Sequence, residues 1–251
     1  ARLTLAAQTS SQSATPPRPR RAPARTMRPM SPDRPQALIV GAGLAGSLLA
    51  IELARLGVRV IVAERRPDPR WRGFLGGRSI NLALSVRGVT ALQRVGLAER
   101  VLADAVPMPG RMLHHAPKPG ARSETIFQPY SKDPSEAIQS VSRAGLNLTL
   151  LEAAAAEPSV QLRFGLRCSK VDLDAPAAEF EDPSGALQRI EADVIFGADG
   201  AFSAVRSAMQ ITDRFDYSQS YLQHGYKELE IPPLDQIPGR AATPRARDGF
   251  A

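Results

Sequence analysis

The sequence predicts an α/β fold built around a parallel sheet. An apolar run at 37–41 leads directly into a glycine-rich turn, a helical segment over 44–56 ended by Gly57, and a second apolar run at 58–64. This order of strand, turn, helix and strand is the unit from which parallel sheets are assembled. Of the 251 residues, 43% are hydrophobic and 23% are charged, which is ordinary for a folded domain and excludes a chain that is disordered throughout.

The remaining elements follow in order along the chain. Ser142 is placed to cap a helix over 143–156, and the turn at 182–185 has the DPSG composition of a hairpin connection. An apolar strand from 193 breaks into a glycine loop, and a short helix begins near Ser203. By apolar pattern, we also predict strands at 79–85, 111–115, 160–165, 168–173, 177–181 and 187–191, and helices at 86–95 and 97–105.

The two ends of the chain differ in composition from the middle. Residues 1–35 are rich in Arg, Pro and Ser, with seven prolines, and predict a disordered tail. A transit peptide, or sequence upstream of a start at Met27 or Met30, are alternative interpretations. Residues 232–251 show no helical or strand period and predict an unstructured C-terminal tail. The folded domain is therefore expected over 36–231.

Composition also limits the function classes. The net charge is +7, but residues 1–32 carry six arginines and no acid, and residues 33–233 are neutral, so a nucleic-acid-binding face is not predicted. The longest apolar stretch, 37–51, is too short to span a membrane. A single cysteine excludes an internal disulfide and a multi-thiolate zinc site, and the three histidines suggest no metal.

The glycine turn carries the clearest functional signal. Gly41, Gly43 and Gly46 form G-x-G-x-x-G between a strand and a helix, the Rossmann-like context in which glycines let a pyrophosphate approach the backbone and the helix N-terminus. Glu64 ends the second strand, where a carboxylate accepts hydrogen bonds from ribose hydroxyls. It repels a 2′-phosphate, so FAD or NAD is favoured over NADP, although Arg65 and Arg66 temper that exclusion.

A second element separates the two favoured cofactors. Asp199 ends an apolar strand and opens a helix in GADGAFSAVR at 197–206. A long, extended cofactor such as FAD needs this second contact, whereas a simple NAD dehydrogenase does not. Asp199 as a plain helix cap is the alternative interpretation.

At this point the chain resembles the single-component flavin aromatic hydroxylases, and within them the branch that acts on L-kynurenine. The resemblance rests on GADGAFSAVR and on five further segments: GRSINLALSVRG at 77–88, MPGRMLHH at 108–115, QPY at 128–130, SVSRAGLN at 140–147 and RFDYSQSYLQHGYKELEIPP at 214–233. It covers about 195 residues in the order of the family. It implies an FAD-binding domain with part of a β-sheet substrate domain, at about 106–140 and 209–231.

The resemblance also implies roles for individual residues. Arg111 and Tyr130 would hold the amino-acid end of L-kynurenine; the apolar flanks of Arg111 favour a partly buried position, and Tyr130 could equally be a surface aromatic. Arg143, at a helix start where a cation is disfavoured, would be offset by the flavin pyrophosphate. Cys168 would act through its backbone. The implied flavin contacts are Ala45, Glu64, Arg65, Arg66, Ala83, Arg143, Cys168 and Ala204.

The implied activity is hydroxylation of L-kynurenine to 3-hydroxykynurenine with NADPH and O2, a step of tryptophan catabolism, in which the flavin carries the chemistry and no residue is nominated as a catalyst. Bacterial relatives are cytoplasmic, and eukaryotic ones sit on the mitochondrial outer membrane through a C-terminal segment.

The family continues past residue 231 with a Gly-Asp motif that grips the flavin, and this chain contains no Gly-Asp dipeptide. We therefore expect the N-terminal half of such an enzyme, a truncated copy whose autonomous activity is doubtful. Two alternatives stay open: a non-catalytic FAD- or nucleotide-binding remnant that needs a partner, and a binder that acts through the basic residues 1–32. The oligomeric state is not predicted.

Overall fold

The computed structural model describes residues 34–72, 81–114, 125–133 and 136–225. The chain divides into two units, 1–212 and 213–251, and every helix and strand named below belongs to the first. The predictions for most of the N-terminal tail and for the tail at 232–251 lie outside the described residues.

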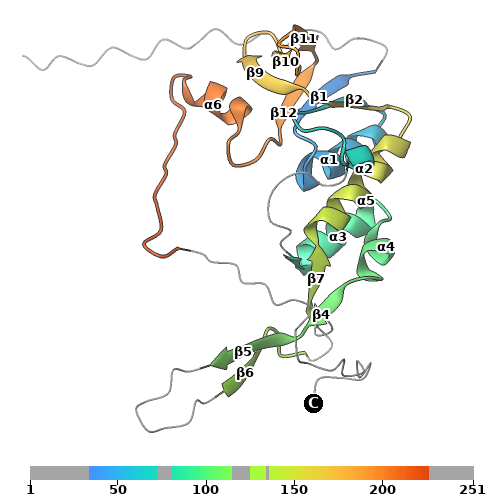
Figure 1. The fold of residues 1–251 in the computed structure, drawn as a ribbon, viewed down its shortest axis with the longest axis vertical. Coiled ribbons are helices and arrows are strands. Elements are labelled where there is room, and N and C mark those ends of the chain that lie inside the picture. The colour runs from blue at the N-terminus through green and yellow to red at the C-terminus, as the bar shows by residue number, and fades with distance from the viewer. Residues whose placement is uncertain (1–33, 73–80, 115–124, 134–135, 226–251) are drawn as a thin grey trace, which may run out of the picture. The chain divides into compact units, whose positions relative to one another are not determined.

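A four-stranded parallel sheet forms the centre of the first unit (Figure 1). Its strands, in spatial order, are β12 (Val194–Gly197), β1 (Gln36–Val40), β2 (Arg59–Glu64) and β8 (Val160–Phe164). Helix α1 (Leu44–Arg55) connects β1 to β2, as the sequence predicts. The predicted α/β fold on a parallel sheet is therefore confirmed.

Helices cover one face of this sheet. Helix α5 (Arg143–Ala156) packs beside α1, and the shorter helices α3 (Val86–Arg94) and α4 (Ala98–Leu102) extend the same apolar core. Ile39, Val60 and Val62 point to this side because alternate residues of a strand face opposite ways. The Ser142 hydroxyl accepts a hydrogen bond from the Gly145 amide at 3.2 Å, which confirms the predicted cap of α5.

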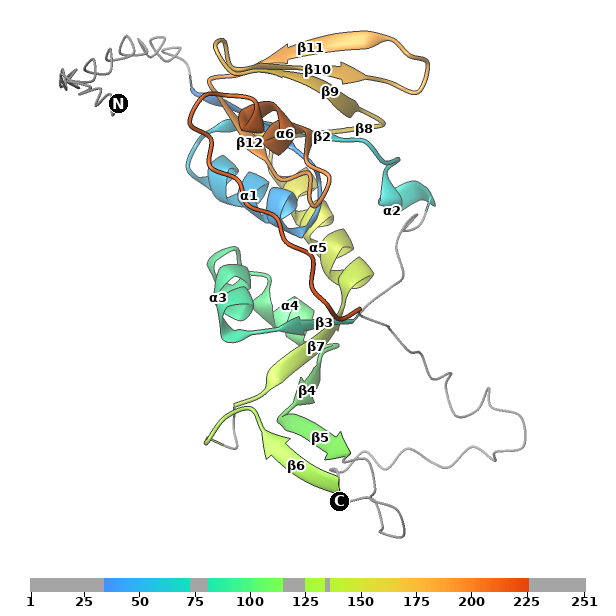
Figure 2. The same ribbon diagram turned by 90° about the vertical axis from the view of Figure 1, so that its left-hand side faces the viewer.

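A small antiparallel sheet covers the opposite face, where a doubly wound fold would place helices (Figure 2). Its strands are β9 (Arg167–Asp172), β10 (Ala177–Glu181) and β11 (Leu187–Glu191). Phe180, Ala178 and Ile190 from this sheet pack against Leu38 and Val40 of β1. Helix α6 (Ala204–Gln210) adds Val205 to the same core.

The rest of the unit contains shorter elements. Three strands form an antiparallel sheet in the order β3 (Asn81–Leu84), β7 (Ile138–Ser142) and β4 (Val106–Met108). Strands β5 (Gly110–His114) and β6 (Thr125–Pro129) form a separate two-stranded pair, and α2 (Pro69–Arg72) follows β2. Among the described helices, none combines the length and apolar character that a membrane crossing requires.

The elements differ from the sequence predictions in several places. The helix expected at 97–105 spans only Ala98–Leu102, and strands β4, β6 and β7 and helix α2 were not predicted as individual elements. The strand contribution expected from 209–231 is not found in its described part, because Met209 and Gln210 end α6 and residues 211–225 form no strand. A strand needs a neighbour for its backbone groups, and no pairing of 211–225 is seen among the described strands.

Candidate dinucleotide site

The glycine turn lies at the carboxyl edge of the parallel sheet, between the ends of β1, β2 and β12. Gly41 has a φ of +104°, which favours glycine, and a Cβ there would lie 2.5 Å from the Ala198 carbonyl oxygen. The Gly41 amide donates to the Ala63 carbonyl, and the Ala198 amide donates to the Val40 carbonyl, both at 2.8 Å. The turn after β1 and the loop after β12 are therefore in direct contact, although 157 residues separate Gly41 from Ala198 in the sequence.

The other two glycines, Gly43 and Gly46, differ in how much space surrounds the position that a Cβ atom would take. A Cβ on Gly46 would lie 2.0 Å from the Gly41 carbonyl oxygen, so this glycine lets α1 pack against the turn. A Cβ on Gly43, by contrast, would have nothing within 4 Å. Gly43 precedes the first turn of α1, whose amides favour an anion. The open space at Gly43 is where the sequence predicts a pyrophosphate.

The Glu64 carboxylate accepts hydrogen bonds from two backbone segments, the glycine turn and the turn after β2. Its Oε2 accepts a hydrogen bond from the Ala42 amide at 2.9 Å, and its Oε1 accepts one from the Arg66 amide at 3.0 Å. Each carboxylate oxygen has a further lone pair for a donor such as a ribose hydroxyl. The carboxylate is therefore fixed beside the glycine turn.

A hollow opens beside this carboxylate. Arg66, Pro67 and Pro69 line it from the segment after β2, and Phe164 lines it from the end of β8. The remaining lining residues are Ala42, Gly43, Glu64, Asn147 and Leu151. Sequence reasoning missed Pro67, Pro69, Asn147, Leu151 and Phe164. The signal available for two of them was the spacing of four that puts Asn147 and Leu151 on one face of α5.

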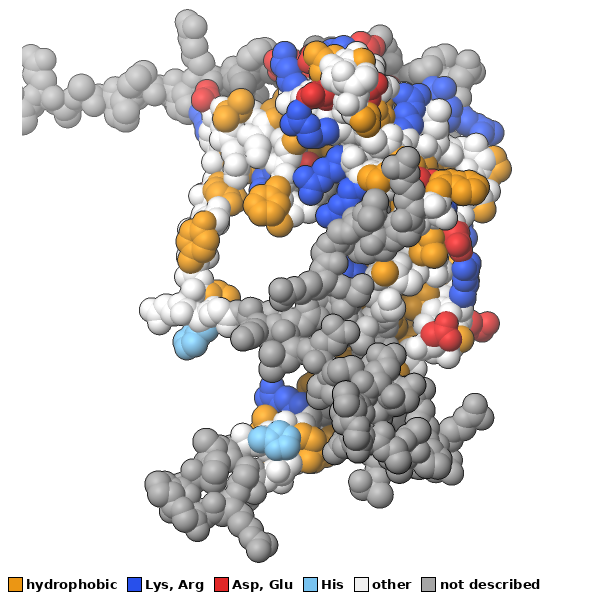
Figure 3. Space-filling view, viewed as in Figure 1, with side chains coloured by type: hydrophobic (Ala, Val, Ile, Leu, Met, Phe, Trp, Pro, Cys, Tyr) orange, Lys and Arg blue, Asp and Glu red, His pale blue; other side chains and the backbone are white. Residues whose placement is uncertain are grey.

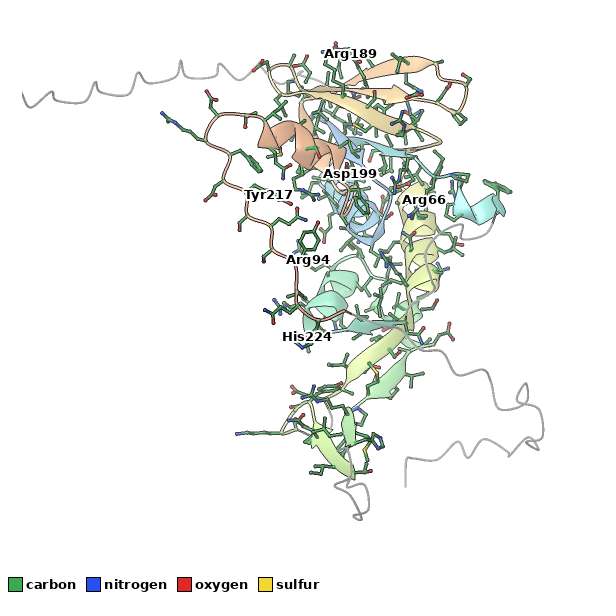
Figure 4. The ribbon with its side chains drawn as sticks, turned by 60° about the vertical axis from the view of Figure 1, so that its left-hand side comes forward. Arg66, Arg94, Arg189, Asp199, Tyr217 and His224 are labelled. Atoms are coloured by element: carbon green, nitrogen blue, oxygen red, sulfur yellow. The ribbon has the colours of Figure 1, made fainter. Side chains whose placement is uncertain are left out.

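Asp199 caps helix α6 in the structure. Its Oδ1 accepts a hydrogen bond from the Ser203 hydroxyl, and its Oδ2 accepts one from the Ala204 amide, both at 2.6 Å. Ser203 in turn accepts from the Arg206 amide at 2.9 Å. The helix-cap interpretation therefore describes what the side chain does. Asp199 nevertheless lies at the carboxyl edge of the sheet, as does Arg66 (Figure 4), and its Cα would be 2.9 Å from a Cβ on Gly41.

Cys168 lies on β9 opposite Phe180 and is half-buried. Burial raises the pKa of its thiol to about 11, and the negative charge of Asp199 adds to the increase. Helix α6, whose first turn is held by Asp199, packs against β9, the strand that carries Cys168. At neutral pH the thiol is protonated.

The other predicted flavin contacts surround the same region. Ala45 is exposed in the first turn of α1, and Arg65 is exposed after β2. Arg143 is the first residue of α5, one turn before Asn147 on the same helix face. Ala83 lies on β3, two residues from Asn81, which pairs with the cap residue Ser142. Of these residues, Arg143 stands at the start of α5, and Ala83 lies on the strand that pairs with the segment before it.

The predicted substrate residues lie on the β5–β6 pair. Arg111 pairs in register with Gln128, and its Nε donates to the Gln128 Oε1 at 2.7 Å. The Tyr130 amide donates to the Pro109 carbonyl at 2.9 Å, which continues the pairing by one step. Arg111 is exposed rather than partly buried, because its neighbour Met112 is itself 54% exposed on a two-stranded pair. Sequence reasoning did not single out Gln128 as a partner of Arg111.

The geometry suits an adenine dinucleotide bound in an extended form. It offers an open approach at Gly43, a fixed carboxylate at Glu64, and a second loop at Asp199 in contact with the first. Within the residues that the structure describes, no three His, Cys, Asp or Glu side chains gather closely enough to hold a metal ion.

The model of the FAD binding domain family matches residues 34–226. The chain belongs to this family. The match confirms the part of the sequence prediction that concerns the FAD-binding domain, and it separates FAD from NAD, which the glycine turn alone does not.

Relatives of known name are similar over most of this chain. A kynurenine 3-monooxygenase of Myxococcus xanthus is 47% identical over 195 residues, which are 77% of this chain and 41% of the relative. A kynurenine 3-monooxygenase of Stenotrophomonas maltophilia is 48% identical over 198 residues, 78% of this chain and 42% of the relative. The chain therefore spans about two fifths of the length of these relatives, and its resemblance to the aromatic hydroxylases is confirmed.

Solved structures support the fold. The flavin-dependent monooxygenase PieE, in complex with FAD and substrate, superposes with a TM-score of 0.58 at 24% identity, over 71% of this chain and 32% of PieE. The p-nitrophenol 4-monooxygenase PnpA of Pseudomonas putida superposes with a TM-score of 0.57 at 22% identity, over 71% of this chain and 44% of PnpA. At these identities the likeness concerns the fold alone.

Proposed function

We propose that this chain binds FAD and forms the cofactor half of a monooxygenase that hydroxylates L-kynurenine to 3-hydroxykynurenine with NADPH and O2. The observation that carries the proposal is the contact between the glycine turn and the Asp199 loop at one sheet edge, in a chain 47% identical to a kynurenine 3-monooxygenase. FAD, when bound, supplies the redox chemistry.

The described residues would hold FAD through its polar parts. Glu64 would accept hydrogen bonds from ribose hydroxyls while it keeps the Ala42 amide, because each carboxylate oxygen accepts more than one donor. The amides at the start of α1 would face the pyrophosphate, and Arg143 would neutralise part of its charge. Asp199 would act through the placement of α6, since both its oxygens already hold that helix.

Arg111 would bind the carboxylate of the amino-acid substrate. Its Nε is engaged by Gln128, which leaves the two terminal nitrogens of the guanidinium for a bidentate contact. Tyr130 follows Gln128 by two residues and would lie on the same face of the pair as Arg111, since alternate strand residues share a face. The hydrogen bond to Gln128 fixes the guanidinium plane before a substrate arrives.

A second candidate is an FAD-binding module that requires a partner for hydroxylation. The observation that favours it is the exposure of the β5–β6 pair, on which Met112, Phe127 and Tyr130 are each about half exposed. No third strand joins this pair among the described residues. A substrate site that must exclude water needs more cover than this pair receives from the described part of the chain.

Flavin binding by the purified 251-residue chain tests both candidates. Gly43→Val fills the open space next to the turn, so we expect it to leave the unfolding midpoint unchanged and to lower FAD affinity at least tenfold, measured by quenching of flavin fluorescence. Ala186→Val, which adds two methyl groups at an exposed position beside a hairpin turn, is the control.

The reaction product then distinguishes the two candidate functions. Formation of 3-hydroxykynurenine from L-kynurenine, NADPH and O2, detected by mass spectrometry, would support the hydroxylase. Bound FAD without product would support the module that requires a partner. Failure of the wild-type chain to bind FAD would contradict both.

A further inference from the structure

The non-glycine residue at the centre of the cofactor turn, Ala42, is held at both of its backbone groups. Its amide donates to Glu64 Oε2 at 2.9 Å. Its carbonyl accepts from the Ser47 hydroxyl and from the Asn147 side-chain amide, each at 3.2 Å. Ala42, Ser47 and Asn147 are all buried. The peptide between Ala42 and Gly43 is thereby fixed, and with it the direction of the Gly43 amide.

Asn147 comes from a different part of the chain than Glu64 and Ser47, the other two residues that hold the backbone of Ala42. Ser47 belongs to α1, directly after the turn, whereas Asn147 reaches the turn from α5, 105 residues along the chain. Only the amide nitrogen of Asn147 can face the Ala42 carbonyl, because a carbonyl accepts and does not donate. The side chain also lines the hollow beside Glu64. One residue therefore touches both the turn and the space in which the dinucleotide would lie.

The burial of this asparagine is costly without such a role. Its neighbours on the buried side of α5 are Leu146, Leu150, Leu151 and Ala154, and Asn147 is only 9% exposed among them. A polar amide in an apolar setting loses its hydrogen bonds to water and requires partners in the protein. An aliphatic side chain would pack there at lower cost, so the Ala42 contact accounts for the polar group.

We infer that Asn147 is a positioning residue for the dinucleotide: it locks the glycine turn from α5 so that the amides of the turn and of the start of α1 stay directed at a pyrophosphate. The inference rests on the proposed FAD binding. Asn147 and Leu151 both line the hollow beside Glu64, and Arg143 lies one turn before Asn147 on the same face of α5.

The binding of two ligands, ADP and adenosine, distinguishes a role of Asn147 in positioning the glycine turn from a simple contact with the ligand in the pocket. ADP carries the adenosine and the pyrophosphate group, whereas adenosine lacks every phosphate. Loss of the lock misdirects the turn amides, so it weakens the binding of ADP and leaves that of adenosine nearly unchanged. Loss of a pocket contact alone weakens the binding of both in the same proportion.

The test measures ADP and adenosine affinity of the full chain by NMR titration for three variants. Asn147→Leu keeps the number and branching of the side-chain heavy atoms and removes the donor; we expect about a tenfold loss for ADP and less than about a twofold loss for adenosine. Asn147→Asp sets an acceptor against the Ala42 carbonyl and adds charge beside Glu64, so the ADP loss is larger. Leu148→Ala, on the exposed side of α5, should change neither.

Three results would overturn the inference. These are wild-type ADP affinity in Asn147→Leu, equal proportional losses for the two ligands, or loss of the helical circular dichroism signal in both Asn147 variants without ligand, which would make the residue a requirement of the fold. If the wild-type chain binds neither ADP nor FAD, the proposed function fails and the lock has no ligand to position.

Discussion

Asp199 shows how one carboxylate serves the fold and the site together. Both of its oxygens are engaged at the start of α6, by Ser203 and Ala204. Its backbone lies against Gly41, where any Cβ would collide with it. The residue therefore shapes the cofactor edge by placing α6 and the loop before it. The sequence indicated that Asp199 is important but left both interpretations open, because a cap and a ligand contact require the same residue type at a helix start.

Cys168 provides a prediction at the same scale. Burial and the charge of Asp199 raise the pKa of its thiol to about 11, against an ordinary value of 9.0. The thiolate is the reactive form, and a shift of two pKa units removes it roughly hundredfold at pH 8. We expect Cys168 to react with a disulfide reagent about a hundred times more slowly in the folded chain than in urea, with a rate that continues to rise past pH 10.

The measurement is clean because the sequence has a single cysteine. Release of the coloured thiolate from the reagent gives the rate directly, and the same chain in urea is the control. Similar rates in the two conditions would contradict the burial of this thiol.

At the scale of elements, three helix ends meet at Arg55. Its terminal nitrogens donate to the carbonyls of Arg94 and Val95 at 3.2 and 3.0 Å, at the end of α3. Its Nε pairs with Glu157 at 3.2 Å, directly after α5. A cation is favoured at helix ends because the last carbonyls there lack partners within the helix. Arg55 thus links α1, α3 and α5.

We expect Arg55→Ala to lower the free energy of unfolding by about 1–2 kcal/mol, since hydrogen bonds from a partly exposed cation are lost. Arg55→Lys should recover only part of this, because an ammonium group lacks the fork that reaches two carbonyls. Urea denaturation gives the values. Arg59→Ala, at an exposed position of β2, is the control and should change stability by less than about 0.5 kcal/mol. Equal effects of Arg55→Ala and Arg59→Ala would refute the link.

Sequence patterns predicted the elements that have buried apolar runs. Strands β1 and β2 and helices α1 and α5 have such runs, and their positions are confirmed within a few residues. Strand β12 was predicted from its apolar sequence, although its residues are partly buried or exposed. Strands β6 and β7 were missed because Thr125–Pro129 is exposed throughout and Ile138–Ser142 is buried only at Val141. Apolar and polar residues alternate along a strand when one of its faces is buried. A strand without a buried face therefore shows little of this alternation.

For the whole molecule, exposed apolar side chains of the β5–β6 pair form a surface that can associate, and Figure 3 shows apolar side chains on this part of the molecule. Met112 and Phe127 pair in register on one face and are 54% and 51% exposed, and adjacent exposed apolar groups of this kind promote association. We expect the chain to bind a hydrophobic dye and to associate at tens of micromolar. Replacing Met112 and Phe127 by threonine should reduce both dye fluorescence and the sedimentation coefficient.

Leu187→Thr removes a comparable exposed side chain from β11, away from this pair, and serves as the control. An equal reduction by Leu187→Thr, or no reduction by the double variant, would show that the pair is not the associating surface.

The glycines and acidic residues of the candidate site could be predicted from the sequence. The residues that line the hollow beside them were harder to predict. G-x-G-x-x-G and Glu64 have fixed spacings along one βαβ unit, so the sequence alone brings them together. Phe164 and Asn147 reach the hollow from β8 and α5, whose register against the turn is set by tertiary packing. Gln128 faces Arg111 only because of the β5–β6 register, which no local pattern reveals.

The pairing of β1 with β12 joins Ala37 to Val194 and closes a loop of more than 150 residues. Pairings between distant parts of a chain form slowly, because the entropy of closing the loop is lost before the contact stabilises it. During synthesis, β1 leaves the ribosome long before its neighbour β12 exists. The cofactor edge is therefore completed only after β12 has been translated, and FAD can assist only this final closure of the sheet.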